Sequence, residues 1–331
     1  GGKKNFERLL DYLKYRVLES NTSQEILPPV VYPSVGIYHP DYEGLVFSRR
    51  EDYVKWLTNN RERTFQNSAS QNSTVKNTAE DKPVIAVLIQ RASIEVMQTA
   101  LVDATIEKIE QRGAIALPFF FELSPFASDY TPLLIDSSTG DTAVDIIINY
   151  RMIHWANKRK AEFERLGVPV LQGLSYFDGD KNKWEQDIQG VSPGMTPFTL
   201  VLPETAGVID PLTVATLGSA SSETSASMED LELSEQVIEY QLDHMVEKAF
   251  RMVNLKYKKN VDKRLTVFIW GERDMGASFL NVPDSLHTLA HRLNAEGYQV
   301  EPYEHDWYSD KAKAILEPWY RDDRLGTNID E

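Results

Sequence analysis

The sequence predicts an α/β fold with parallel sheets and flanking helices, divided into several domains. Short, continuous apolar runs alternate with longer segments of helical spacing, and glycines stand where those helices should end. The chain has 331 residues, which is long for one hydrophobic core and favours two or three domains. These observations predict strand–helix–strand units joined by right-handed crossovers.

Residues 1–65 are expected to combine a helix with a short α/β segment. Apolar side chains at helical spacing predict a helix over residues 5–19. Val35–Tyr38 is typical of a short strand and is followed directly by His39. Residues 61–82 are rich in Asn, Ser, Thr and Gln, so we expect a linker there.

Residues 83–217 show the α/β pattern most clearly. Val84–Ile89 is a continuous apolar run, as expected for a strand that is buried on both faces of a sheet. A helical pattern follows and ends at Gly113, a residue type that favours helix ends. Further strands are expected at 114–121, 144–149, 168–171 and 198–202, with helices over 94–111 and 154–166.

A second linker is expected over residues 218–232, where Ser, Thr and Glu dominate. Residues 233–331 then begin with a long helical pattern and return to the order strand, helix, strand. The expected elements are a helix over 231–257, strands at 265–270 and 298–303, and helices over 285–296 and 309–320. We therefore predict a second α/β unit of similar type.

Composition excludes several classes of function. The net charge of −15 argues against a nucleic-acid partner, because such binding needs a basic face. Cysteine is absent, which excludes disulfides, thiolate metal sites and cysteine nucleophiles. No apolar run approaches the roughly 18–20 residues of a membrane span. We expect a cytoplasmic location, although the absence of cysteine would also permit a periplasmic one.

Motifs for nucleotide chemistry and for serine hydrolysis are also missing. The sequence holds no GxGxxG, no GxxxxGK[ST] and no GxSxG. Any ATP-driven step must therefore come from another subunit. Gly271–Gly276 follows a predicted strand, so its amides can hold an anion. An ordinary strand-to-helix loop would have the same appearance.

His287 and His291 are the candidate metal ligands. They are four residues apart in a predicted helix, so both project from one face. Two imidazoles on one face can bind a divalent metal if a carboxylate converges on them. The alternative is a solvated polar helix face.

Two further residues are candidate catalytic groups because each follows a predicted strand. His39 follows Val35–Tyr38, and Glu204 follows the run 198–202. In parallel α/β sheets, ligands gather at the carboxyl ends of strands. The alternatives are that Glu204 bonds loop amides and that His39 packs against Pro40.

Five segments stand out by their order and spacing over about residues 34–303: Val35–Asp41, Lys82–Phe121, Leu166–Gln172, Gln189–Ile209 and Met275–Leu286. Together they resemble segments of one family, the large subunits of cobaltochelatase (CobN-type) and magnesium chelatase. The first reads VGIYHPD and the last MGASFLNVPDSL. The resemblance implies a tetrapyrrole-binding subunit, and we predict Glu272, Asn281 and Ser285 as residues that bind the macrocycle.

The resemblance also implies the reaction. Such a subunit binds a corrin or porphyrin and inserts cobalt or magnesium, while AAA-type ATPase subunits use ATP to drive the step. The Pro283-Asp284-Ser285 version of the last segment is more similar to the cobalt branch. It also allows a homologue linked to haem uptake that removes iron from haem. A non-catalytic, two-lobed α/β binding module is the alternative from another class.

The chain begins Gly1-Gly2-Lys3-Lys4 and lacks an initiator Met, so we interpret it as a fragment. Large subunits of the family it resembles are several times longer. We therefore expect the isolated fragment to be inactive.

Overall fold

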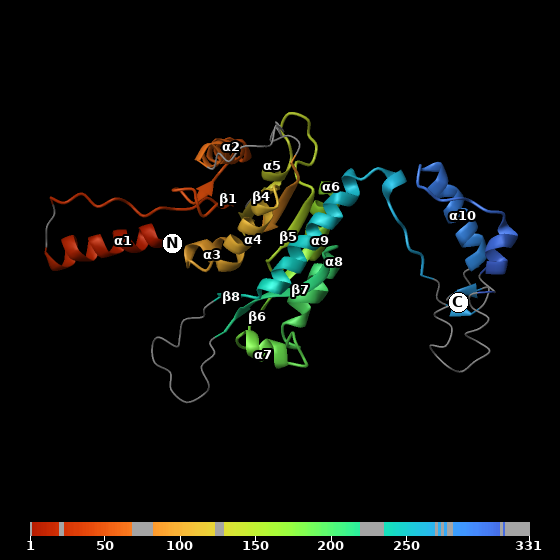
Figure 1. Cartoon of the computed structure of the whole chain (residues 1–331). Helices are drawn as coiled ribbons and strands as arrows, with labels where there is room; N and C mark the ends of the chain where they lie inside the picture. Colours follow the sequence, from red (N-terminus) through yellow and green to blue (C-terminus); the bar gives the residue numbers. More distant parts are fainter. Residues whose placement is uncertain are drawn as a thin grey trace. The chain divides into compact units, whose positions relative to one another are not determined.

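The computed structural model describes residues 2–19, 23–67, 82–122, 129–218, 235–268, 271–272, 275–276, 281–311 and 314. The chain forms two compact units, Gly1–Val253 and Asn254–Glu331 (Figure 1). The boundary between them lies inside a helix, near the end of the long helical pattern, and not in the predicted linker 218–232.

An eight-stranded mixed sheet forms the centre of the first unit in the described part of the chain, with the order β2-β1-β4-β3-β5-β6-β7-β8. The inner strands run parallel to one another: β3 (Val84–Leu88), β4 (Ile115–Phe121), β5 (Ile146–Asn149), β6 (Val170–Tyr176) and β7 (Ile209–Leu217). The outer strands are antiparallel to their neighbours: β1 (Val35–Tyr38), β2 (Val46–Phe47) and β8 (Glu235–Val237). The α/β class is confirmed, and the N-terminal strand belongs to the main sheet.

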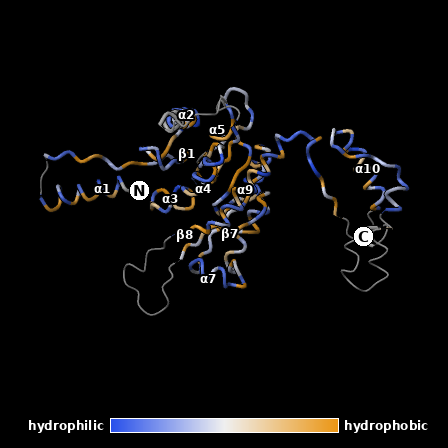
Figure 2. The backbone as a smooth tube through the Cα atoms, in the orientation of Figure 1, coloured by the Kyte–Doolittle hydropathy of each residue, from blue (hydrophilic) through white to orange (hydrophobic). Residues whose placement is uncertain are grey.

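Helices cover both faces of this sheet. One face packs against α4 (Ala100–Gln111) and α9 (Glu239–Tyr257). The other face packs against α2 (Arg50–Asn67), α5 (Thr131–Leu134) and α6 (Ala156–Leu166). Figure 2 shows hydrophobic residues along the inner strands between these helices. Burial on both faces explains why those strands are continuous apolar runs in the sequence.

Shorter elements complete the first unit: α1 (Gly2–Tyr12), π-helix η1 (Leu13–Leu18), α3 (Arg91–Glu95), α7 (Lys181–Gln186), π-helix η3 (Pro197–Val201) and α8 (Leu202–Thr205). The predicted helix over residues 5–19 is thus confirmed as α1 and η1. The glycine stop of α6 is also confirmed, because Gly167 has a φ of +65° and its N–H bonds to Phe163 O at 3.0 Å.

Two predictions for this unit are wrong. Residues 198–202 lie in η3 and at the start of α8 instead of a strand. Phe198 and Val201 are half exposed there, and a five-residue apolar run does not by itself distinguish a strand from a helical turn. The first part of the predicted linker 61–82 is helical, because α2 continues to Asn67. Residues 68–81 of that linker, and residues 219–232 of the second, lie outside the described residues.

The second unit contains the 3₁₀ helix η4 (Asn260–Asp262), the antiparallel pair β9 (Gly271–Glu272) and β10 (Met275–Gly276), and α10 (Val282–Ala295). The predicted helix near 285–296 is therefore confirmed. Residues 265–268 and 298–303, which we expected in strands, form no strand among the described residues, and the N–H of Val300 bonds to Tyr298 O at 2.8 Å in a tight turn. Phe268 is 91% exposed. The expected strand–helix–strand unit does not form in the described part of 254–311.

Gly173 in β6 is a position of close approach. A Cβ atom on Gly173 would lie 2.3 Å from Cε1 of Tyr150. The Tyr150 ring is anchored, because its hydroxyl oxygen lies 2.8 Å from Thr105 Oγ1. Gly173→Ala is therefore expected to lower the free energy of unfolding by about 1–3 kcal/mol in chemical denaturation. Gly194→Ala is the control, since nothing lies within 4 Å of that added atom, and equal losses would contradict the explanation.

Candidate functional site

The order of the inner strands identifies one place in the first unit where a ligand site is expected. From β3 the chain crosses to β4 on one side and then returns to β5 on the other side of β3. The strand order therefore reverses beside β3. In open α/β sheets, ligands bind at the carboxyl ends of the strands next to such a reversal.

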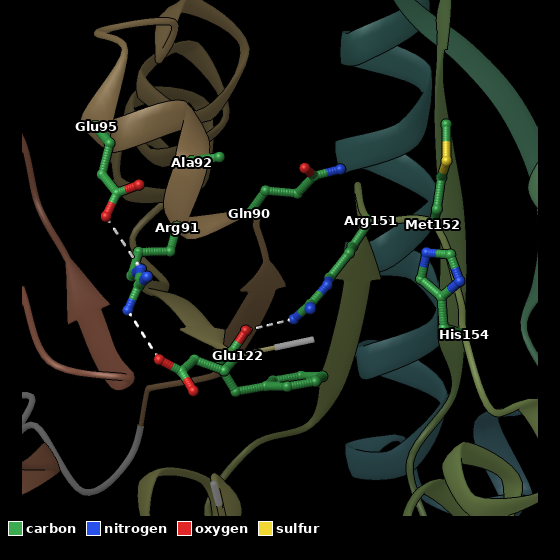
Figure 3. Close-up of a pocket in the computed structure, with 9 residues that line it drawn as sticks. Gln90, Arg91, Ala92, Glu95, Glu122, Arg151, Met152 and His154 are labelled. Carbon is green, nitrogen blue, oxygen red and sulfur yellow. Dashed lines mark hydrogen bonds and ion pairs between the residues drawn. The ribbon is translucent and has the colours of Figure 1, made fainter. Parts of the chain in front are cut away.

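A cavity of about 290 Å³ lies at this point. The segments that follow β3, β4 and β5 supply its lining: Gln90, Arg91, Ala92, Glu95, Phe121, Glu122, Arg151, Met152 and His154 (Figure 3). We call it the carboxyl-edge pocket. Its polar side chains come from segments distant in sequence, which the parallel sheet brings together.

A buried amide network shapes the loop that follows β5. Asn149 Nδ2 donates to Gln172 Oε1 on β6 at 2.7 Å and to the carbonyl oxygen of Arg151 at 2.8 Å. Asn149 Oδ1 accepts from the backbone N–H of Arg151 at 3.1 Å. Since Asn149 and Gln172 are both almost fully buried, these bonds satisfy groups that would otherwise be costly to bury. They also fix the backbone that carries Arg151.

Arg151 is the most unusual group of the pocket. It is only 7% exposed, and Nη1 donates to the carbonyl oxygen of Phe121 at 2.6 Å. Its guanidinium carbon lies 4.2 Å from the centre of the Phe121 ring, a cation–π distance. Burial, and secondarily the charge of Arg159, lower the pKa of Arg151 to about 10, so the group stays protonated at neutral pH.

A second buried arginine lies beside the same ring but has a carboxylate partner. The Arg159 guanidinium carbon lies 4.5 Å from the Phe121 ring centre. Its Nη1 donates to Glu162 Oε2, which also accepts from the Tyr130 hydroxyl group at 2.7 Å. Arg151 forms no such ion pair with any carboxylate in the described ranges.

The rim of the pocket carries opposite charges in contact. Arg91 Nε lies 3.1 Å from Glu95 Oε1, and Arg91 Nη1 lies 3.2 Å from Glu122 Oε1 (Figure 3). Arg91 thus pairs with two carboxylates, whereas Arg151 pairs with no carboxylate among the described residues. Apart from His154, the lining carries two positive and two negative charges, which cancel. The arrangement is suited to holding a small polar or anionic group against a buried cation.

Comparison with known proteins decides the family. The family model described as CobN/Magnesium Chelatase matches residues 1–316. The chain belongs to the CobN/magnesium chelatase family. The chloroplastic magnesium-chelatase subunit ChlH of Oryza sativa subsp. indica is 23% identical over 304 residues, covering 87% of this chain and 20% of the relative. The aerobic cobaltochelatase subunit CobN of Pseudomonas aeruginosa is 25% identical over 228 residues, covering 66% of this chain and 18% of the relative.

The fold agrees with the family. The catalytic subunit of cobaltochelatase from Mycobacterium tuberculosis superposes with a TM-score of 0.65 at 20% identity, covering 97% of this chain and 24% of that one. The chain thus spans about a fifth to a quarter of the length of these CobN/magnesium chelatase relatives.

His39 does not lie at the carboxyl edge of the parallel strands. Because β1 is antiparallel to β4, with Ile37 opposite Phe119, the end of β1 lies beside the amino-terminal half of β4. His39 is 2% exposed and packs edge-on against Trp56 at 4.8 Å. Its Nε2 lies 3.7 Å from Glu110 Oε1. The expectation that His39 faces the carboxyl edge is wrong.

Glu204 also lies away from that edge. It is exposed on α8, directly before β7, and therefore at the amino end of the parallel strands. β1 and β7 are separated by five strand spacings in the order β1-β4-β3-β5-β6-β7, roughly 24 Å at about 4.8 Å each. The structure therefore does not bring His39 and Glu204 together.

The predicted macrocycle ligands lie in the second unit. Asn281 is the N-cap of α10, where its Oδ1 accepts from Asp284 N at 3.2 Å. Ser285 Oγ donates to Asn281 O at 2.7 Å. Both side chains thus have structural partners at one helix end, and their binding roles remain predictions. The side chain of Glu272 lies outside the described residues.

His287 and His291 share one face of α10, as their spacing predicted. Their ring centres are 4.5 Å apart, and the His305 ring lies 6.0 Å from His287. His305 Nε2 is engaged with Asp284 Oδ1 at 2.6 Å. Within the described residues, no group of three or more His, Cys, Asp or Glu side chains is arranged to hold a metal ion. The metal role of His287 and His291 remains a prediction.

Sequence analysis did not single out the residues of the carboxyl-edge pocket. The available signal was positional, because Gln90-Arg91, Glu122 and Asn149–Arg151 each stand at or just after the end of a buried strand. None of the described helices is long and apolar enough to cross a membrane.

Proposed function

We propose that this chain is part of the tetrapyrrole-binding large subunit of a metal chelatase. The match of the CobN/magnesium chelatase family model to residues 1–316 is the observation that carries the proposal. The substrates would be a corrin or porphyrin and a divalent metal ion, cobalt or magnesium. Partner subunits of the AAA type would use ATP, because this sequence has no phosphate-binding motif of its own.

The chemistry assigns two tasks to the protein. Metal enters the macrocycle as pyrrole protons leave, so the large subunit must orient the ring and offer a proton acceptor. The carboxyl-edge pocket supports the orienting task, because rigid strand ends hold its polar groups. Glu95, Glu122 and His154 are the acceptors that line it.

An absorption titration tests this function. Metal-free protoporphyrin IX and a metal-free corrin are each added to the purified protein. One of them is expected to show a saturable shift of its main absorption band, together with quenching of tryptophan fluorescence. The control is the same protein unfolded in guanidinium. If neither macrocycle shows a saturable change beyond that control, the proposed function is wrong.

The same titration bears on the haem alternative. Under that alternative, haem binds and its spectrum changes with time to that of the metal-free porphyrin. Under the chelatase proposal, the haem spectrum does not convert to the metal-free form.

A further inference from the structure

Arg151 is a buried cation whose charge lacks a counter-charge among the described residues. A charge taken out of water is strongly destabilising unless pairing and hydrogen bonds compensate for it. The protein supplies one carbonyl oxygen, that of Phe121, and the face of one aromatic ring. By contrast, the neighbouring Arg159 is paired with Glu162. The difference indicates that the compensation for Arg151 comes from a ligand.

The orientation of Arg151 leaves donors available to such a ligand. A guanidinium group has five N–H donors in a planar fork. One of them bonds to Phe121 O, and the others have no hydrogen-bond partner in the described part of the chain. Figure 3 shows the side chain extending into the pocket between Gln90 and Glu122. The contact with the Phe121 ring and the bond to Phe121 O hold the guanidinium group in place, and its planar fork suits a bidentate contact with a carboxylate.

Charge and size narrow the choice of ligand. Arg91 already contacts two carboxylates, so Arg151 is the arginine of the lining that has no ion-pair partner among the described residues. A carboxylate would add one negative charge next to Glu95 and Glu122, whereas a dianion such as phosphate would add two. The cavity of about 290 Å³ is at the lower end of ligand pockets, which suits a substituent of a large ligand.

We propose that the carboxyl-edge pocket binds one peripheral carboxylate of the tetrapyrrole through the guanidinium group of Arg151. This inference rests on the proposed function for the identity of the ligand. The pocket would hold the edge of the macrocycle and set its orientation, while the ring itself lies outside the cavity. Arg151 is thus a binding and positioning residue.

A first experiment tests the pocket without the macrocycle. Sodium propionate is titrated into the protein, and the side-chain N–H signals of Arg151 are followed by ¹H–¹⁵N NMR. A saturable shift at millimolar concentration is expected, and propionamide, its neutral counterpart, should cause none. Arg151→Met identifies the signal, because that signal disappears in the variant. Equal responses to propionate and propionamide, or no response to either, would overturn the proposal for the pocket.

A second experiment tests whether the pocket contributes to binding of the macrocycle. Protoporphyrin IX and its diamide are compared in binding to the wild type and to Arg151→Met. If only the corrin binds in the first titration, its acid and amide are used. Arg151→Met is expected to weaken binding of the acid by about 10- to 100-fold and to leave binding of the amide unchanged. Equal effects on acid and amide would overturn the proposal even though the macrocycle binds.

Controls separate binding from folding. Arg49→Met removes the same charge from an exposed arginine that does not line this pocket, and it should leave both affinities unchanged. Arg151→Lys keeps the charge but loses the planar fork, so its affinity for the acid should fall between wild type and Arg151→Met. If Arg151→Met melts well below the wild type, the comparison of acid and amide is made with Arg151→Lys. If no macrocycle binds to any variant, the proposed function fails, and the propionate titration alone decides the pocket.

Discussion

Replacing Phe120 with alanine is expected to lower the free energy of unfolding by about 3–5 kcal/mol. Phe120 lies in β4, near the middle of the sheet, and is fully buried in the core beneath α4 and α9. A Cβ atom on the neighbouring Gly36 would lie 2.9 Å from Phe120 Cζ, so the ring is closely surrounded. The cavity left by its removal could not be filled without moving β1. Guanidinium denaturation followed by circular dichroism measures the loss.

Phe6→Ala is the matched control. Phe6 lies on α1 and is 60% exposed, so its removal should change the free energy of unfolding by no more than about 0.5 kcal/mol. Similar losses in the two variants would mean that burial at β4 does not determine the stability of this unit.

The inner strands were predictable because their burial is visible in the sequence. In β3, Ile85 and Val87 contact one core while Ala86 and Leu88 contact the other, so every position is apolar. The glycines after α4 and α6 likewise predicted where these helices end. Gly113 and Gly167 both have positive φ, a conformation in which glycine carries no steric penalty.

Other elements depend on partners that a local pattern does not reveal. Residues 198–202 are as apolar as a strand, yet only Thr199 of η3 is buried. In the second unit, Leu265 and Val267 are about half exposed because no neighbouring strand pairs with them in the described ranges. A strand is defined by its hydrogen-bonded neighbour, and hydrophobicity alone does not supply one.

The candidate site was harder to predict for the same reason. His39 and Glu204 were chosen on the assumption that each lies at the carboxyl end of a parallel strand. That assumption fails for His39 because β1 is antiparallel to β4. It fails for Glu204 because residues 202–205 form helix α8 and not the end of a strand. Arg151 follows β5 in the sequence, but its importance comes from the strand order, which places β3, β4 and β5 side by side.

Glu162→Gln is expected to lower the free energy of unfolding by about 3 kcal/mol, because among the described residues Glu162 is the only carboxylate that pairs with buried Arg159. Glutamine keeps the shape and can still accept from the Tyr130 hydroxyl group, so the loss isolates the charge. Two guanidinium groups would then lie over the Phe121 ring without an ion-pair partner among the described residues. Denaturation at neutral pH measures the change.

The same helix provides the control. Glu164 is exposed and pairs with Lys160 at 3.8 Å, so Glu164→Gln should change stability by no more than about 0.5 kcal/mol. The double variant Glu162→Gln with Arg151→Met should regain about 1 kcal/mol over Glu162→Gln alone, because one of the two repelling cations is gone. If adding Arg151→Met deepens the loss instead, the two arginines do not repel each other. Arg151 would then be a structural group of the core, and its role in holding a ligand would lose its physical basis.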